Sequence, residues 1–202
     1  YAIITDDTVA VTATVNASIT FDLDTAGSDD SACNTDETAA PYSIALGTIT
    51  NTDTRVSGAA DAVNLICMDL DTNAGDGAVV TVQNTNGTSG LASTSVPGDD
   101  IDSSTAVAND NTENYGICVV STSDVTGNFD IAGTYDGNTC VANTEGNDVD
   151  ALSATPVTIL DTDDDPIATG RATIAVNASI TIAQPAHADY TDALTFIATG
   201  TF

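Results

Sequence analysis

Residues 9–23 read VAVTATVNASITFDL, and the odd-numbered positions from Val9 to Leu23 are all apolar. Most of the even-numbered positions carry Thr, Asn, Ser or Asp. Successive side chains of a β-strand point to opposite faces, so this alternation predicts a strand with one buried and one solvated face. The hexapeptide VNASIT at 15–20 recurs at 176–181. The match fades outside the hexapeptide, which favours two strands of similar pattern over a duplicated domain.

Runs of the same kind fill much of the remaining chain. Further strands are predicted at 42–50, 62–70, 78–84, 114–122 and 156–161. The last of the alternating segments, 171–202, is predicted to be a hairpin around the turn AQPAHAD (183–189). No window of helical length has a convincing 3.6-residue period.

Polar stretches rich in Gly, Asp and Asn separate these runs, and those near 24–41 and 123–155 are expected to be acidic loop insertions. The fold class that follows is all-β: an immunoglobulin-like or jelly-roll β-sandwich with an extended N-terminal strand. The chain is expected to divide into an N-terminal arm, residues 1–14, and one β-sandwich domain, residues 15–202.

The charge balance restricts the partners of the chain. The 202 residues include 30 Asp and Glu against two basic residues, Arg55 and Arg171, for a net charge of −28. Such a chain is repelled by nucleic acid and by anionic lipid, so neither is expected to be a partner. No run approaches the roughly 18 apolar residues that a membrane span needs. A first residue that is Tyr rather than Met predicts an exported form with its signal peptide removed, located outside the cell or at its surface.

Four cysteines are present, and none lies in a CxxC motif. An even number in an exported chain predicts two disulfides, for which three connectivities are open. We favour the pairs Cys33–Cys67 and Cys118–Cys140, because each of them encloses a local loop.

The alternation at 9–23 is too long for an ordinary strand. Fifteen residues at about 3.3 Å each span roughly 50 Å, whereas globular strands usually have about 5–6 residues. One explanation is an arm that adds to the sheet edge of another molecule, with Val9, Val11, Ala13 and Val15 as anchors. A single strand that bends at a bulge between the two sheets of its own sandwich, or a disordered leader, would also fit the pattern.

Three segments carry a family resemblance: PYSIALGTI (41–49), VNLICMDL (63–70) and ITIAQPAHADYTDALTFIATGTF (180–202). They resemble secreted pilin-like domains of the spore coat U and chaperone–usher type. Members of that group tend to end in a turn with Pro and Gly, then Tyr-Thr/Ser-Asp, then an alternating strand that closes on an aromatic residue. Here these positions are Pro185, Tyr190–Asp192 and Leu194–Phe202. Other secreted β-sandwich filament proteins share this architecture.

The resemblance implies an incomplete immunoglobulin-like sandwich that a strand from the next subunit completes. Residues 1–14 would be the donor strand. Residues 15–18 and the terminal strand would flank the acceptor groove, with Phe196, Ala198 and Phe202 on the core-facing side. The acidic insertions depart from the family pattern.

Ligand chemistry is sparse in this sequence. The only histidine, His187, has no accompanying nucleophile motif, and no phosphate-binding or haem motif occurs. We therefore expect a protein that is not an enzyme and whose one candidate cofactor is Ca²⁺, although an Asp-pair hydrolase is a third alternative. The oxygen-rich loop DLDTNAGDG offers Asp69, Asp71, Asn73 and Asp76 as calcium ligands. A second such loop is DTDDDP (161–166).

These features predict an extracellular structural protein, the subunit of a pilus-like filament whose partner is a further copy of itself. The alternative is a monomeric, secreted or cell-surface module for adhesion or calcium binding, in which the long first strand folds back in cis.

Overall fold

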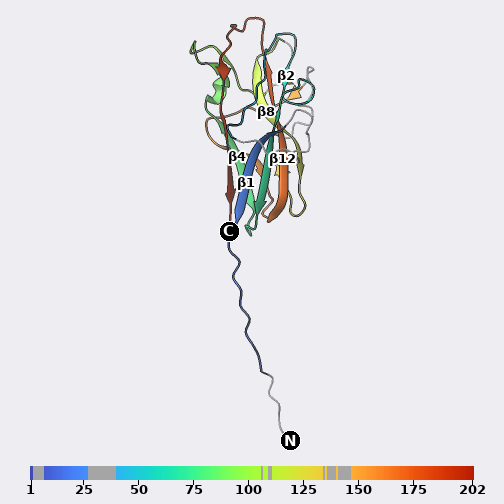
Figure 1. Cartoon of the computed structure of the whole chain (residues 1–202). Helices are drawn as coiled ribbons and strands as arrows, with labels where there is room; N and C mark the ends of the chain where they lie inside the picture. The colour runs from blue at the N-terminus through green and yellow to red at the C-terminus, as the bar shows by residue number, and fades with distance from the viewer. Residues whose placement is uncertain are drawn as a thin grey trace.

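The computed structural model describes residue 1 and residues 7–26, 40–105, 107–108, 111–133, 135, 140 and 147–202. Strands dominate these residues, as predicted, and their only helix is a single 3₁₀ turn at Gly87–Ser89. The strands form antiparallel sheets around one main hydrophobic core, which gives an all-β sandwich (Figure 1).

The first sheet has β12 at its centre and β1 at one edge. Its hydrogen-bonded order is β1-β3-β12-β2, and β8 also pairs with β12. The bounds are β1 (Ile19–Ala26), β2 (Arg55–Val56), β3 (Leu65–Thr72), β8 (Asn114–Ser123) and β12 (Ile167–Ser179). The second half of β12 is buried on both faces, so apolar residues occupy consecutive positions there.

The second sheet lies opposite, in the order β14-β4-β11-β9, so that β14 forms one edge. The bounds are β4 (Ala78–Asn84), β9 (Asp130–Ile131), β11 (Val157–Asp161) and β14 (Leu194–Gly200). Two small sheets, β13-β5-β6 and β10-β7, complete the fold. Their bounds are β5 (Leu91–Ser93), β6 (Asp100–Ile101), β7 (Val107–Ala108), β10 (Asn147–Asp148) and β13 (Tyr190–Thr191).

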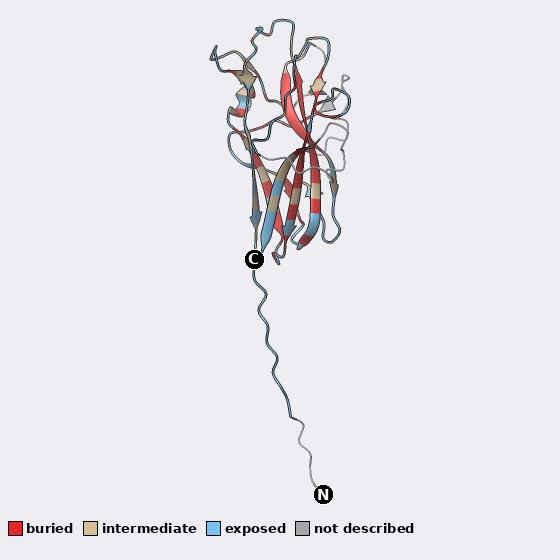
Figure 2. Ribbon diagram, viewed as in Figure 1, coloured by how far each residue is buried: buried red, intermediate tan, exposed pale blue. Residues whose placement is uncertain are grey.

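The core lies between the two main sheets, where alternate side chains from each meet. The buried residues are distributed along the strands of the sandwich (Figure 2). The least exposed members of the core are Met68, Leu70, Val80, Val82, Ile117, Ile159, Leu160 and Ile174. Residues 123–155, expected to be an insertion, also contribute to this core through Phe129 and Leu152, which are each 2% exposed.

Two predictions of secondary structure need correction: the strand at 42–50 and the hairpin at 171–202. Residues 42–49 form no strand, although Ile44 and Leu46 pack against the core. Residues 171–202 are not a hairpin, because β12 lies in the first sheet and β14 in the second. Residues 180–193 cross between the sheets, so the core-facing sides of β12 and β14 meet across the core rather than side by side.

The first strand begins at Ile19, ten residues later than the alternation that starts at Val9. Residues 15–18 are exposed and lie in no strand, whereas their twin, residues 176–179, is buried in β12. The prediction that 15–18 flank the groove as a strand is therefore wrong. The same sequence forms a strand only in the second copy, because only that copy has a neighbouring strand on each side.

The Cys118–Cys140 disulfide is formed, and both of its cysteines are fully buried. It belongs to a second, smaller cluster with Leu65, Val149 and Ala175, on the face of the first sheet that points away from the main core. Cys67 is also disulfide-bonded. Its predicted partner, Cys33, lies outside the described residues.

Candidate functional site

The described part of the predicted N-terminal arm, residues 7–14, and the residues that link it to β1, 15–18, are extended and carry exposed apolar side chains. From here on, the term arm covers residues 7–18. The arm leaves the base of the domain beside the C-terminus and runs away from the sandwich (Figure 1, Figure 2). The exposed fractions of Val9, Val11 and Val15 are 85%, 88% and 83%, and Ala13 is exposed as well. All four predicted anchors therefore lie on one continuous apolar stripe that the sandwich of their own chain does not cover.

The domain itself has a groove between two sheet edges. A cavity of about 490 Å³ opens between β1 and the β13–β14 region. Its walls include Leu23 of β1 and Leu194 and Phe196 of β14. Its other lining residues include Ile66, Leu91, Tyr115, Val176 and Tyr190. We call this cavity, together with the facing edges of β1 and β14, the acceptor groove.

The edge of β14 in the acceptor groove has main-chain groups available for pairing. Thr85 N donates to Ala193 O at 3.0 Å, and Thr201 N donates to Gly77 O at 2.9 Å. These bonds fix the odd-numbered residues of β14 as the ones bonded to β4, because alternate residues of an antiparallel strand face each neighbour. The even-numbered residues, including Phe196 and Ala198, therefore direct N–H and C=O toward the groove.

The edge of β1 has the matching arrangement. Asn73 N donates to Ser18 O at 3.2 Å, so the even-numbered residues of β1 face β3. Phe21 and Leu23 then direct their main-chain groups toward the groove and their half-buried side chains toward the core. Both edges thus present main-chain donors and acceptors above an apolar floor, at the two-residue spacing of the arm.

Two of the three predicted acceptor residues face the core, and the third, Phe202, is exposed. Phe196 and Ala198 are half-buried and pack on the core from β14, as expected for a core-facing strand. Phe202 lies beyond the end of β14 and is 61% exposed. Its ring lies back against the end of the strand. A Cβ placed on Gly200 would be 3.1 Å from an atom of this ring. Sequence reasoning missed Leu23 and Leu194, although both continue the alternating pattern of their strands.

The start of β14 is organised by the carboxylate of Asp192. Asn84 Nδ2 donates to Asp192 Oδ2 at 2.9 Å, and Asn86 N donates to Asp192 Oδ1 at 3.2 Å. Burial raises the pKa of Tyr115 above its ordinary value, and the nearby charge and hydrogen bond of Asp192 raise this pKa further. The Tyr115 phenol in the groove therefore stays protonated at neutral pH.

Replacing Asp192 by Ala is expected to lower the free energy of unfolding by about 1–3 kcal/mol, because it removes the acceptor of Asn86 N and one of the two acceptors of the buried Asn84 amide, whose other acceptor is Gly87 O. Urea unfolding of the purified domain measures this change. Thr195→Ala, on the exposed face of β14, is the matched control and should change stability little. An equal effect of both substitutions would show that Asp192 does not organise the strand.

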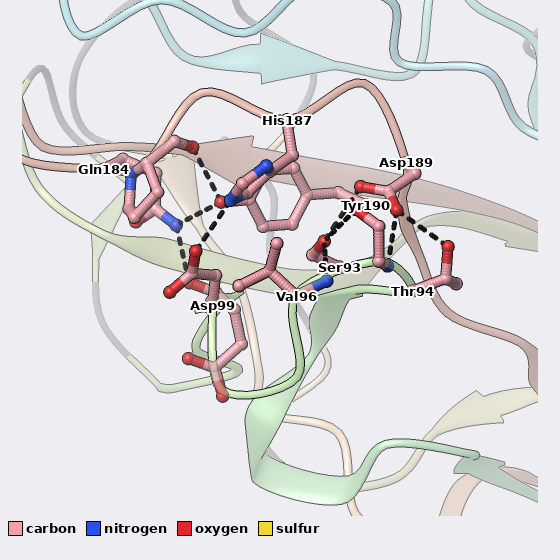
Figure 3. A network of polar contacts seen from close by, with 11 residues as sticks. Ser93, Thr94, Val96, Asp99, Gln184, His187, Asp189 and Tyr190 are labelled. Carbon is pink, nitrogen blue, oxygen red and sulfur yellow. Dashed lines mark hydrogen bonds and ion pairs between the residues drawn. The ribbon is translucent and has the colours of Figure 1, made fainter.

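A polar network fastens the turn before β13 to the loop between β5 and β6 (Figure 3). His187 Nε2 lies 2.6 Å from Asp99 Oδ2, and Gln184 Nε2 donates to Tyr190 Oη at 3.0 Å. Asp189 accepts bonds from Ser93 Oγ, Thr94 Oγ1 and Ser95 N. Hydrogen bonds from Ser95, Thr94 and Ser93 lower the pKa of Asp189 well below its usual range. This network holds Tyr190 at the head of the acceptor groove.

A second cavity of about 570 Å³ lies beside the first and shares Ile44, Leu46, Leu91 and Tyr190 with it. Residues 44–46 therefore separate the two cavities. Arg55 holds this segment, since its Nε donates to Leu46 O at 2.8 Å while its Nη1 lies 2.9 Å from Asp61 Oδ1.

Three of the four predicted calcium ligands of the first acidic loop are engaged in other contacts. Asp69 Oδ1 accepts a bond from Arg171 Nε at 3.0 Å, and burial raises the pKa of Asp69 despite the opposing charge of Arg171. Asp71 Oδ1 accepts from Thr169 N. Asn73 binds the main chain of the arm, and Asp76 is exposed.

A different acidic group comes together in space. One carboxylate oxygen each from Asp100, Asp102 and Glu113 lies within 4.8 Å of the others, and among the described residues this is the one such group of Asp, Glu, His or Cys. Sequence spacing did not indicate the Asp100 group, because only the fold brings Glu113 close to Asp100 and Asp102.

The second predicted calcium loop, residues 161–166, lies at the base of the domain, where Asp161 Oδ1 accepts a hydrogen bond from Asp163 N.

No family model, curated protein or solved structure matches this chain. Within the part of the chain that the structure describes, no helix has the length and apolar character needed to cross a membrane.

Proposed function

We propose that this chain is the subunit of an extracellular filament, in which the arm of one copy adds as a strand to the acceptor groove of the next. The observation that carries the proposal is that the spacing of apolar residues in the arm matches the spacing of main-chain groups along the groove. The arm presents exposed apolar residues at every second position, and the groove lies beside β1 and β14, which are each the edge strand of a main sheet in the part of the chain that the structure describes. This is also the arrangement that the resemblance to pilin-like domains implies.

The contact has enough apolar surface to be stable. Burying Val9, Val11 and Val15 contributes about 1.5–3 kcal/mol each before the cost of ordering the arm. New main-chain hydrogen bonds to Leu23, Phe196 and their neighbours would add to this and would set the register of the inserted strand. Insertion would also cover two exposed strand edges, which are otherwise sites of uncontrolled association.

The direction of the arm supports donation in trans over a first strand that folds back in cis. Residues 7–15 lie away from their own domain, whereas Leu23 of β1 lines a groove that the arm leaves open. A monomeric surface module would instead place the arm inside this groove.

Binding of an arm peptide to a domain that lacks residues 1–14 tests the proposal. A peptide of residues 7–18 at about 100 times its dissociation constant is expected to raise the melting temperature by roughly 5–10 °C, since about 2.7 kcal/mol of binding energy stabilises the folded state. The control peptide carries Asp in place of Val9, Val11 and Val15. If neither peptide changes the melting temperature, the groove does not accept the arm.

A further inference from the structure

The last residues of the arm are held to the domain by the side chain of Asn73. Ser18 N donates to Asn73 Oδ1 at 2.8 Å, and Asn73 Nδ2 donates to Asn16 O at 2.8 Å. Ser18 O in turn accepts from Asn73 N at 3.2 Å and from Thr72 Oγ1 at 3.0 Å. The arm is therefore fixed in an extended path as far as Asn16, beyond the last ladder pair of β1 and β3, Ile19 with Thr72.

These contacts lie at the point where the arm would have to turn. To enter the groove of its own domain, the arm must reverse direction between Val15, its last anchor, and Ile19, the first residue of β1. A loop of three residues, 16–18, is long enough for such a hairpin. The reversal would have to break the bonds that Asn73 makes to this same segment.

Insertion in cis is the natural competitor of filament assembly. A tethered strand has an effective concentration on the order of millimolar for its own groove, which exceeds the concentration of subunits in most solutions. A chain with a groove and a matching arm therefore needs a feature that disfavours closure onto itself.

We infer that Asn73 acts as a positioning residue that directs the arm away from its own groove and so favours donation to a second copy. The inference rests on the proposed function. The amide of Asn73 suits this role because its oxygen accepts from Ser18 N while its nitrogen donates to Asn16 O, which imitates a strand partner where β3 has ended. Aspartate keeps only the acceptor, and alanine keeps neither group.

The test compares the full chain with its Asn73→Ala and Asn73→Asp variants by amide hydrogen exchange, at a concentration too low for assembly. The arm of the full chain is expected to exchange fast at residues 7–15. In Asn73→Ala, the population with a protected arm is expected to rise about tenfold, which corresponds to about 1.4 kcal/mol. Asn73→Asp should give an intermediate rise and serves as the second variant if Asn73→Ala does not fold.

Filament yield, measured by sedimentation at higher concentration, separates this inference from the proposed function. Protection of the arm in Asn73→Ala with a loss of filament supports both. Protection without any filament from the full chain supports the role of Asn73 and contradicts the filament. An arm that exchanges equally fast in all three proteins overturns the role of Asn73, whether or not filaments form.

Discussion

If the chain assembles as we propose, deleting residues 1–14 is expected to give folded monomers in place of filaments. The deletion removes Val9, Val11 and Ala13, three of the four apolar anchors, while every described strand begins at Ile19 or later. The domain therefore keeps its two sheets and its core, but it has no strand to donate. Electron microscopy and size-exclusion chromatography of the two proteins, side by side, measure the change.

Ionic strength must be controlled in this comparison. Subunits with a net charge of −28 repel one another, and at about 0.15 M salt this repulsion is screened beyond roughly 8 Å. The matched control replaces Thr8, Thr12 and Thr14 by Ser, which keeps the length of the arm and its apolar stripe. If the full chain stays monomeric and the deletion unfolds the domain, the arm is the first strand of its own sandwich and donation in trans is wrong.

The fold class could be predicted from the sequence because period-two alternation directly reports a half-buried strand. Residues 78–84 are an example, since the predicted strand and β4 coincide. The segment 42–50 shows the limit of this signal. Its alternation places Ile44 and Leu46 toward the core, but residues 42–49 form no strand, and Thr50 forms only an isolated bridge with Asp53.

The candidate site was predictable in part, for a similar reason. The arm could be recognised from the excess length of its pattern, and Phe196 and Ala198 from the terminal strand. The position of β1 opposite β14 depends on which strands pair across the sequence, and local pattern does not contain that information. The role of Asn73 was hidden as well, because its contacts to Asn16 and Ser18 join residues more than fifty positions apart.

A carboxylate on the apolar stripe of the arm is expected to block assembly almost as completely as the deletion does. Val11 lies in the middle of the stripe, so Val11→Asp would bring a charge into a groove whose walls include Leu23, Leu194 and Phe196. No described cation lines this groove to pair with it. Burial of an unpaired charge costs several kcal/mol, so the affinity of the arm should fall by at least about 100-fold.

The neighbouring residue gives a control with the same charge. Thr12 alternates with Val11, so in an inserted strand its side chain would point to solvent, and Thr12→Asp should leave the affinity within a few-fold of the unchanged arm. Both variants have the same net charge, which removes general repulsion as an explanation. Titration of each arm peptide into the domain that lacks residues 1–14 measures the two affinities. Equal losses for both would mean that the arm binds without strand register, and the groove between β1 and β14 would then not be its acceptor.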